Sequence, residues 1–148
     1  MTTDLVLAIL HHIAVFNLFA LLMIEGVLLK PGMGPVEVAR VSKIDAAYGI
    51  MAGVVLAVGV LRVLYGIKGW TYYEANPWFW AKMACFAAVA LVSIAPTMRF
   101  VGWRRRLRAD PAFAPDGREV AAARLLVRLQ ALFFVLILVF AATMARMS

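Results

Sequence analysis

The side chains that could do chemistry in this sequence are cationic or titratable and lie inside long apolar runs. They are His11, His12, Arg62 and Lys82. An imidazole can ligate iron or move a proton, and a guanidinium or ammonium group can hold a carboxylate or a carbonyl oxygen. Ionisable groups inside apolar segments are costly, so each of them needs a partner or a function.

Four apolar runs must position these groups, and they cover residues 5–29, 46–67, 78–101 and 125–145. Each run is long enough to cross a hydrocarbon core of about 30 Å as a helix. Lipid offers the backbone no hydrogen bonds, so a spanning segment of this kind has to be helical. We therefore predict an all-α fold, a transmembrane four-helix bundle that forms one integral membrane domain over residues 1–148.

The composition excludes several classes of protein. Hydrophobic residues make up 65% of the chain and charged residues only 16%, against roughly a quarter charged in a soluble domain. A soluble globular domain and a disordered chain are both excluded. The sequence has no P-loop, nucleophile elbow or HExxH motif. A single cysteine, Cys85, excludes an intrachain disulfide and is interpreted as a packing residue.

Basic residues predict the topology. The chain has 15 Lys and Arg against 8 Asp and Glu, and most of the basic residues lie in the loops after the first and third runs. This pattern favours cytoplasmic loops that meet anionic lipids of a bacterial inner membrane, with both termini in the periplasm, over nucleic-acid binding. The first run lacks a basic start and a cleavage site, so we expect it to remain as the first span.

Depth within the spans groups the reactive side chains into one outer layer. Counted from the outer face, His11 and His12 lie about 9–10 Å deep, and Arg62 and Lys82 about 7–8 Å deep. Cations from three helices at one level are unfavourable unless an anion or an acceptor-rich ligand lies between them. We therefore predict a binding site there. The alternative is that Arg62 and Lys82 reach the outer head groups separately.

The two histidines point about 100° apart on a helix, so they cannot ligate one metal ion from the same face. His11 shares a heptad stripe with Glu25, which favours His11 as the residue that faces the bundle. Either His11 or His12 is a candidate metal ligand or proton-transfer group.

A second polar layer lies near the inner face. Its members are Glu25, Asp45, Arg99 and Arg128. Opposite charges at one depth predict ion pairs of Glu25 and Asp45 with Arg99 and Arg128, and we expect these pairs to be structural.

Two loops carry further signals. Residues 69–80 are rich in aromatic side chains, which is typical of an interfacial belt and is compatible with a lid over the outer site. Asp116 and Glu119 have the spacing of a capping box, so the fourth helix is expected to begin near residue 117.

Several stretches together resemble a known family, namely residues 10–16, 45–49, 61–63, 66–69 and 76–83 with Glu25 and Pro96-Thr97. They resemble a bacterial family of predicted four-helix inner-membrane proteins that is catalogued as a domain of unknown function. The resemblance covers nearly the whole chain. It implies the fold and brings no activity with it.

A weaker similarity is to the bacterial membrane protoporphyrinogen oxidase and the copper-resistance D proteins. Leu10-His11, or His12-Ile13, and the stretch from Trp78 to Lys82 look like features that the former associates with haem b and porphyrin. The later histidines of that family are absent here. Haem ligation would therefore be five-coordinate or would use a second copy of the chain.

Three functions remain open at this point. The first is a small redox-type membrane protein that binds haem b or a quinone near its outer face, with His11 or His12 as ligand and with Arg62 and Lys82 on acidic or carbonyl groups. The second is a non-enzymatic accessory or assembly subunit of a larger membrane complex, or a homodimer. The third is a small transporter, although the middle of the spans offers few polar groups besides Asn17.

Overall fold

The computed structural model describes residues 2–146, and the side chains of residues 3–146. Its elements are α1 (Thr2–Leu28), α2 (Pro35–Tyr65), α3 (Gly69–Glu74), α4 (Pro77–Ala109) and α5 (Gly117–Arg146). No strand occurs among the described residues. The four long helices are each long and apolar enough to cross a membrane. The prediction of an all-α fold with four spanning helices is confirmed.

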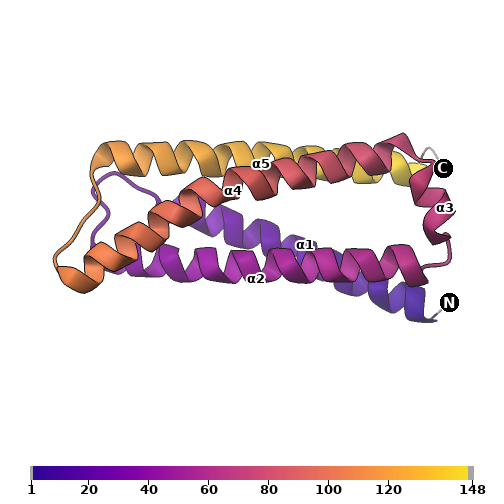
Figure 1. Ribbon diagram of the computed structural model, residues 1–148, viewed down its shortest axis with the longest axis horizontal. Coiled ribbons are helices and arrows are strands. Elements are labelled where there is room, and N and C mark those ends of the chain that lie inside the picture. Colours follow the sequence, from indigo (N-terminus) through magenta and orange to yellow (C-terminus); the bar gives the residue numbers. More distant parts are fainter. Residues whose placement is uncertain (1, 147–148) are drawn as a thin grey trace.

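The four long helices form an antiparallel bundle (Figure 1). The described ends of α1 and α5 lie at one end of the bundle together with α3, and we call this the terminal end. The loops after α1 and α4 lie at the other end, which we call the loop end. The closest pairs are α1 with α2 and α4 with α5, and these pairs meet through α2 with α4 and α1 with α5. α1 and α2 therefore form one helical hairpin, α4 and α5 form a second, and the two hairpins pack against each other.

Three of the long helices extend beyond their apolar runs by eight residues or more, α2 and α5 at their beginning and α4 at its end. α2 begins at Pro35 rather than at residue 46, because Pro35 occupies its first turn and the Gly34 N–H donates to Glu37 Oε2 at 3.0 Å. Asp45 therefore lies inside a helix instead of opening one. α4 continues to Ala109, eight residues beyond the predicted end at 101. Hydropathy marks only the part of a helix that suits lipid, whereas caps and turns decide where the helix ends.

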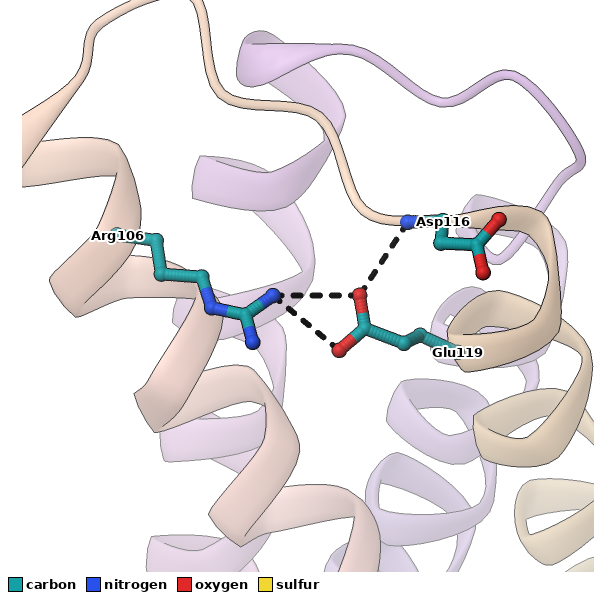
Figure 2. Close-up of polar contacts among 3 residues, drawn as sticks. All are labelled: Arg106, Asp116 and Glu119. Atoms are coloured by element: carbon teal, nitrogen blue, oxygen red, sulfur yellow. Dashed lines mark hydrogen bonds and ion pairs between the residues drawn. The ribbon is translucent and has the colours of Figure 1, made fainter.

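Glu119 holds the beginning of α5 against the end of α4 (Figure 2). The Asp116 N–H donates to Glu119 Oε2 at 3.2 Å, and Arg106 Nη1 donates to both carboxylate oxygens at 3.2 and 3.3 Å. α5 begins at Gly117, as the spacing of Asp116 and Glu119 predicts. The same carboxylate thus serves the helix start and an ion pair across the α4–α5 turn.

The hydrophobic core is concentrated toward the loop end. Its most deeply buried apolar residues there include Leu22, Leu29, Val38, Val41, Phe100, Trp103, Val120 and Ala123. At the terminal end, few large side chains are fully enclosed. The two hairpins are therefore closely packed at the loop end and leave space between them at the terminal end.

Trp103 provides a test of this packing. Its side chain is 2% exposed and contacts Phe100, with ring centroids 5.5 Å apart. We expect Trp103→Ala to lower the free energy of unfolding in detergent by about 3 kcal/mol, because it leaves a cavity in the core. Leu91→Ala, at a position of the same helix that is 69% exposed, is the control and is expected to change little. Equal losses in the two variants would contradict a packed core at the loop end.

Candidate functional site

A pocket of about 440 Å³ lies at the terminal end, and we call it the terminal pocket. His11 reaches it from α1, Arg62 from α2 and Lys82 from α4. The structure thus places three of the four candidate residues from the sequence around one pocket. They are far apart along the chain, and the packing of α1, α2 and α4 brings them together.

Polar atoms in the terminal pocket are short of partners. His11 Nδ1 and Arg62 Nε are buried and make no hydrogen bond. Lys82 Nζ lies 5.3 Å from the centroid of the Phe79 ring. Arg62 and Lys82 bring a guanidinium and an ammonium group to the same pocket as the His11 imidazole. The pocket therefore presents a concentration of positive charge and of hydrogen-bond donors.

No Asp or Glu occurs among the described residues that line the terminal pocket. The two nearest candidates in the sequence have other positions. Asp4 Oδ1 accepts a hydrogen bond of 3.3 Å from the Ile67 N–H and joins the beginning of α1 to the end of α2. Glu74 is exposed at the end of α3. The positive charge of the pocket is therefore not balanced by a carboxylate in its wall.

Aromatic rings form much of the remaining wall. Trp70 and Tyr73 come from α3, and Phe79, Trp80 and Phe86 come from α4. Rings contact one another along this side, with centroids 5.4 Å apart for Tyr73 and Phe79. The aromatic segment that sequence analysis interpreted as a belt or lid therefore contains a short helix that contributes to the wall.

Gly59 is a member of the site, although the small residues of its apolar run favour an interpretation as helix packing. A Cβ atom at this position would lie 3.4 Å from His11 Cε1, so the imidazole packs directly against the α2 backbone. A larger side chain there would push the ring away. The signal in the sequence was a glycine within an apolar run, which by itself is typical of helix packing in membranes.

His12 lies outside the terminal pocket. It is exposed, and its Nδ1 lies 2.6 Å from the Ala8 carbonyl oxygen one turn earlier. Its ring is nearly perpendicular to that of His11, and the centroids are 6.3 Å apart. No group of three or more His, Cys, Asp or Glu that could hold a metal ion occurs among the described residues. Of the two histidines, only His11 faces the candidate ligand site.

The second polar layer forms a cluster toward the loop end. Glu25 and Gln130 are each 1% exposed, and Asp45 is 8% exposed. Thr97 Oγ1 donates to Asp45 Oδ1 at 2.8 Å, and the buried Tyr48 lies about one turn after Asp45 on α2. We call these five residues the carboxylate cluster.

The ion pairs expected for this layer are not formed. Within residues 3–146 the structure has one ion pair, between Arg106 and Glu119, and none joins Glu25 or Asp45 to an arginine. Helix geometry explains the difference. Arg128 lies two residues, about 200°, from Gln130 and is exposed. Arg99 has the same relation to Thr97, so neither side chain faces the buried acids.

A family model described as "Predicted membrane protein (DUF2214)" matches residues 3–147. The chain belongs to this family. The match covers all four spanning helices and both polar clusters, and it agrees with the resemblance to a family of four-helix membrane proteins of unknown function. The chain is therefore a predicted multi-pass membrane protein, and the family description names no activity. No curated protein and no solved structure matches it.

The charge of the terminal pocket leads to a prediction about stability. Lys82→Met keeps the length of the side chain but removes a cation that lies near Arg62 and His11. We expect the ligand-free protein to gain about 1 kcal/mol in its free energy of unfolding, because repulsion and desolvation are relieved. Thermal unfolding in detergent would measure the change.

Lys30→Met, in the exposed turn after α1, is the matched control and should leave the stability unchanged. A clear loss of stability in Lys82→Met would show that Lys82 supports the fold, and would remove the argument that its charge serves a ligand.

Proposed function

We propose that this membrane protein binds an apolar redox ligand in the terminal pocket, and that the ligand's polar end carries oxygen acceptors. The observation that supports this most is that His11, Arg62 and Lys82 line one largely apolar pocket whose described lining contains no carboxylate. An acceptor-rich group between them would balance the charge and would complete the missing hydrogen bonds of His11 Nδ1 and Arg62 Nε.

The energetic argument rests on the low polarity of the surroundings. A buried donor without a partner costs about 1–3 kcal/mol, more if it is charged. Two such polar atoms, His11 Nδ1 and Arg62 Nε, line a pocket that an ammonium group also lines, so the arrangement costs the ligand-free fold stability. Residues placed at a cost to stability are common at binding sites, because the ligand supplies the missing interactions.

A quinone fits this arrangement best. Polar side chains from three helices line the same pocket, which suits a carbonyl oxygen of a flat head group, and the aromatic side chains from α3 and α4 offer faces for its ring. A bound quinone would supply two-electron chemistry coupled to protons. His11 Nδ1 would donate a proton to the head group or accept one from it. Arg62 and Lys82 would favour an electron-rich oxygen beside them.

Haem b is the second candidate, and a different observation favours it. Met83 and Met144 line the same pocket as His11, so an imidazole and a thioether are both available to hold iron. Arg62 and Lys82 would then receive the two carboxylates of the haem. Bound haem would supply one-electron chemistry. The family match neither requires nor excludes it.

Extraction and spectroscopy of the purified full chain test the proposal. We expect the detergent-purified protein to contain a bound quinone, which organic extraction and mass analysis would detect. His11→Ala and Arg62→Met should reduce the bound amount by about tenfold or more, since each removes a charge-assisted or buried hydrogen bond. His12→Ala, at the neighbouring exposed position, is the matched control and should keep it.

A Soret band that disappears in His11→Ala but not in His12→Ala would favour haem b over the quinone. A protein that contains neither ligand, before and after incubation with each, would refute the proposed function.

The location of the pocket in the membrane is a further part of the proposal. The loop end carries most of the exposed basic residues, including Lys30, Arg40, Lys43, Arg104, Arg105 and Arg108. Positive charge of this kind remains on the cytoplasmic side. We infer that the terminal end, with the pocket, faces the periplasm of a bacterial inner membrane.

Cysteine labelling tests this orientation. In a Cys85→Ser background, Thr71→Cys in α3 should react with a membrane-impermeant thiol reagent added to spheroplasts. Ala114→Cys, in the α4–α5 loop, should react only after the membrane is broken. The reverse pattern would place the pocket on the cytoplasmic side.

A further inference from the structure

The carboxylate cluster combines two acids with no cation. Glu25 comes from α1, Asp45 and Tyr48 from α2, Thr97 from α4 and Gln130 from α5, so all four long helices contribute. Glu25 and Asp45 are 1% and 8% exposed, so both carboxyl groups lie inside the bundle. Two negative charges without a cation in a low-dielectric core are very unfavourable.

The other groups around the acids do not supply positive charge. On α2, the remaining buried titratable group is the Tyr48 hydroxyl. On α4 the partner of Asp45 is the neutral Thr97, and the half-buried Arg99 makes no ion pair. On α5 the buried residue is the neutral Gln130, while Arg128 is exposed. Burial without a cation therefore favours the protonated form of at least one of the two acids.

Gln130 gives independent support. Both polar atoms of its side chain are buried without a hydrogen-bond partner, and so is Glu25 Oε1. A Cβ atom at Gly26 would lie 3.6 Å from Val127, which sets the register of α1 against the antiparallel α5. On α5, Gln130 lies three residues from Val127 toward the terminal end. On α1, Glu25 lies one residue from Gly26 in the same direction. Their axial separation is therefore about 3 Å.

Both side chains also lie on the buried stripes of their helices, at 1% exposure. The amide of Gln130 thus points into the same part of the core as the carboxyl group of Glu25. A protonated carboxyl can donate to an amide oxygen, whereas a carboxylate cannot. The unpartnered amide oxygen is therefore suited to accept a hydrogen bond from the neutral form of Glu25.

A second cavity lies between this cluster, which contributes Tyr48 and Thr97 to its lining, and the terminal pocket. Its volume is about 220 Å³, and we call it the middle cavity. Tyr48, Ser93 and Thr97 line it together with small residues such as Gly49, Ala52 and Ala90. It shares the lining residues Leu18, Phe86 and Phe134 with the terminal pocket. A space with several polar groups and this volume is large enough to hold water.

We propose that Glu25 and Asp45 form a proton-binding site, in which Glu25 holds the proton against Gln130 and exchanges it through the middle cavity. The proton is released to water or to a base, and the carboxyl becomes a carboxylate. The binding of the proton stands without any ligand. Delivery of that proton to a quinone in the terminal pocket rests on the proposed function.

Infrared spectroscopy of the full chain in lipid vesicles tests the site directly. At neutral pH we expect the carbonyl stretching band of a protonated carboxylic acid, and we expect it to disappear in Glu25→Gln. Glu74→Gln, at an exposed acid of α3, is the control and should leave the band unchanged. Absence of the band in the wild-type protein, or its survival in both Glu25→Gln and Asp45→Asn, would refute the site.

Gln130→Leu tests the site without removing an acid. It should shift the frequency of the band and leave its area unchanged, because the carboxyl loses its acceptor. This variant decides the question even if Glu25→Gln fails to fold, since an unshifted band would show that Glu25 does not donate to Gln130.

The route of proton exchange through the middle cavity is tested after transfer of the protein into D₂O. Exchange of the carboxyl proton for deuterium shifts the band, and the rate of this shift is measured. Ala90→Leu narrows the middle cavity and should slow this exchange by about tenfold or more, because water is excluded from the path. Ala87→Leu, on the same helix but not in the lining, is the matched control. Equal rates in the two variants would refute the route. None of these readouts needs a bound ligand, so failure of the proton site is distinguishable from failure of the proposed function.

Discussion

The constraint on which this structure depends is that lipid offers no hydrogen bonds to a polar group. The backbone meets this constraint by forming helices, so the chain becomes four long helices joined by short turns. Side chains must find partners within the protein, and two groups of them do so only in part. His11 and Arg62 near the terminal end, and Glu25 and Gln130 toward the loop end, keep buried polar atoms without a hydrogen-bond partner.

Packing is uneven along the bundle: the loop end is closely packed, and the candidate ligand site lies at the terminal end. At the loop end, Phe100 and Trp103 fill the space between the hairpins, and Glu119 ties α4 to α5. At the terminal end, the hairpins diverge around a pocket of about 440 Å³. The closely packed half thus fixes how the helices lie against one another, while the other half presents titratable side chains from three of them to one pocket.

The two polar groups have opposite character. Around the terminal pocket, the charged groups are cations, and around the carboxylate cluster they are acids. The middle cavity lies between them and shares residues with the terminal pocket. Cations attract an electron-rich ligand, and buried acids hold protons, so the arrangement suits chemistry in which electrons and protons move together.

The sequence by itself determined the number of spanning helices, their approximate places and the level at which His11, Arg62 and Lys82 lie. These follow from hydropathy and from a fixed rise per residue, both of which are local. Only the tertiary structure decided that His11 rather than His12 faces the pocket and that Asp45 lies inside α2. It also showed that the arginines of the inner layer turn away from the acids. Such outcomes depend on the rotation of each helix about its axis. Packing against the neighbouring helices sets this rotation, and the depth of a residue along one helix does not reveal it.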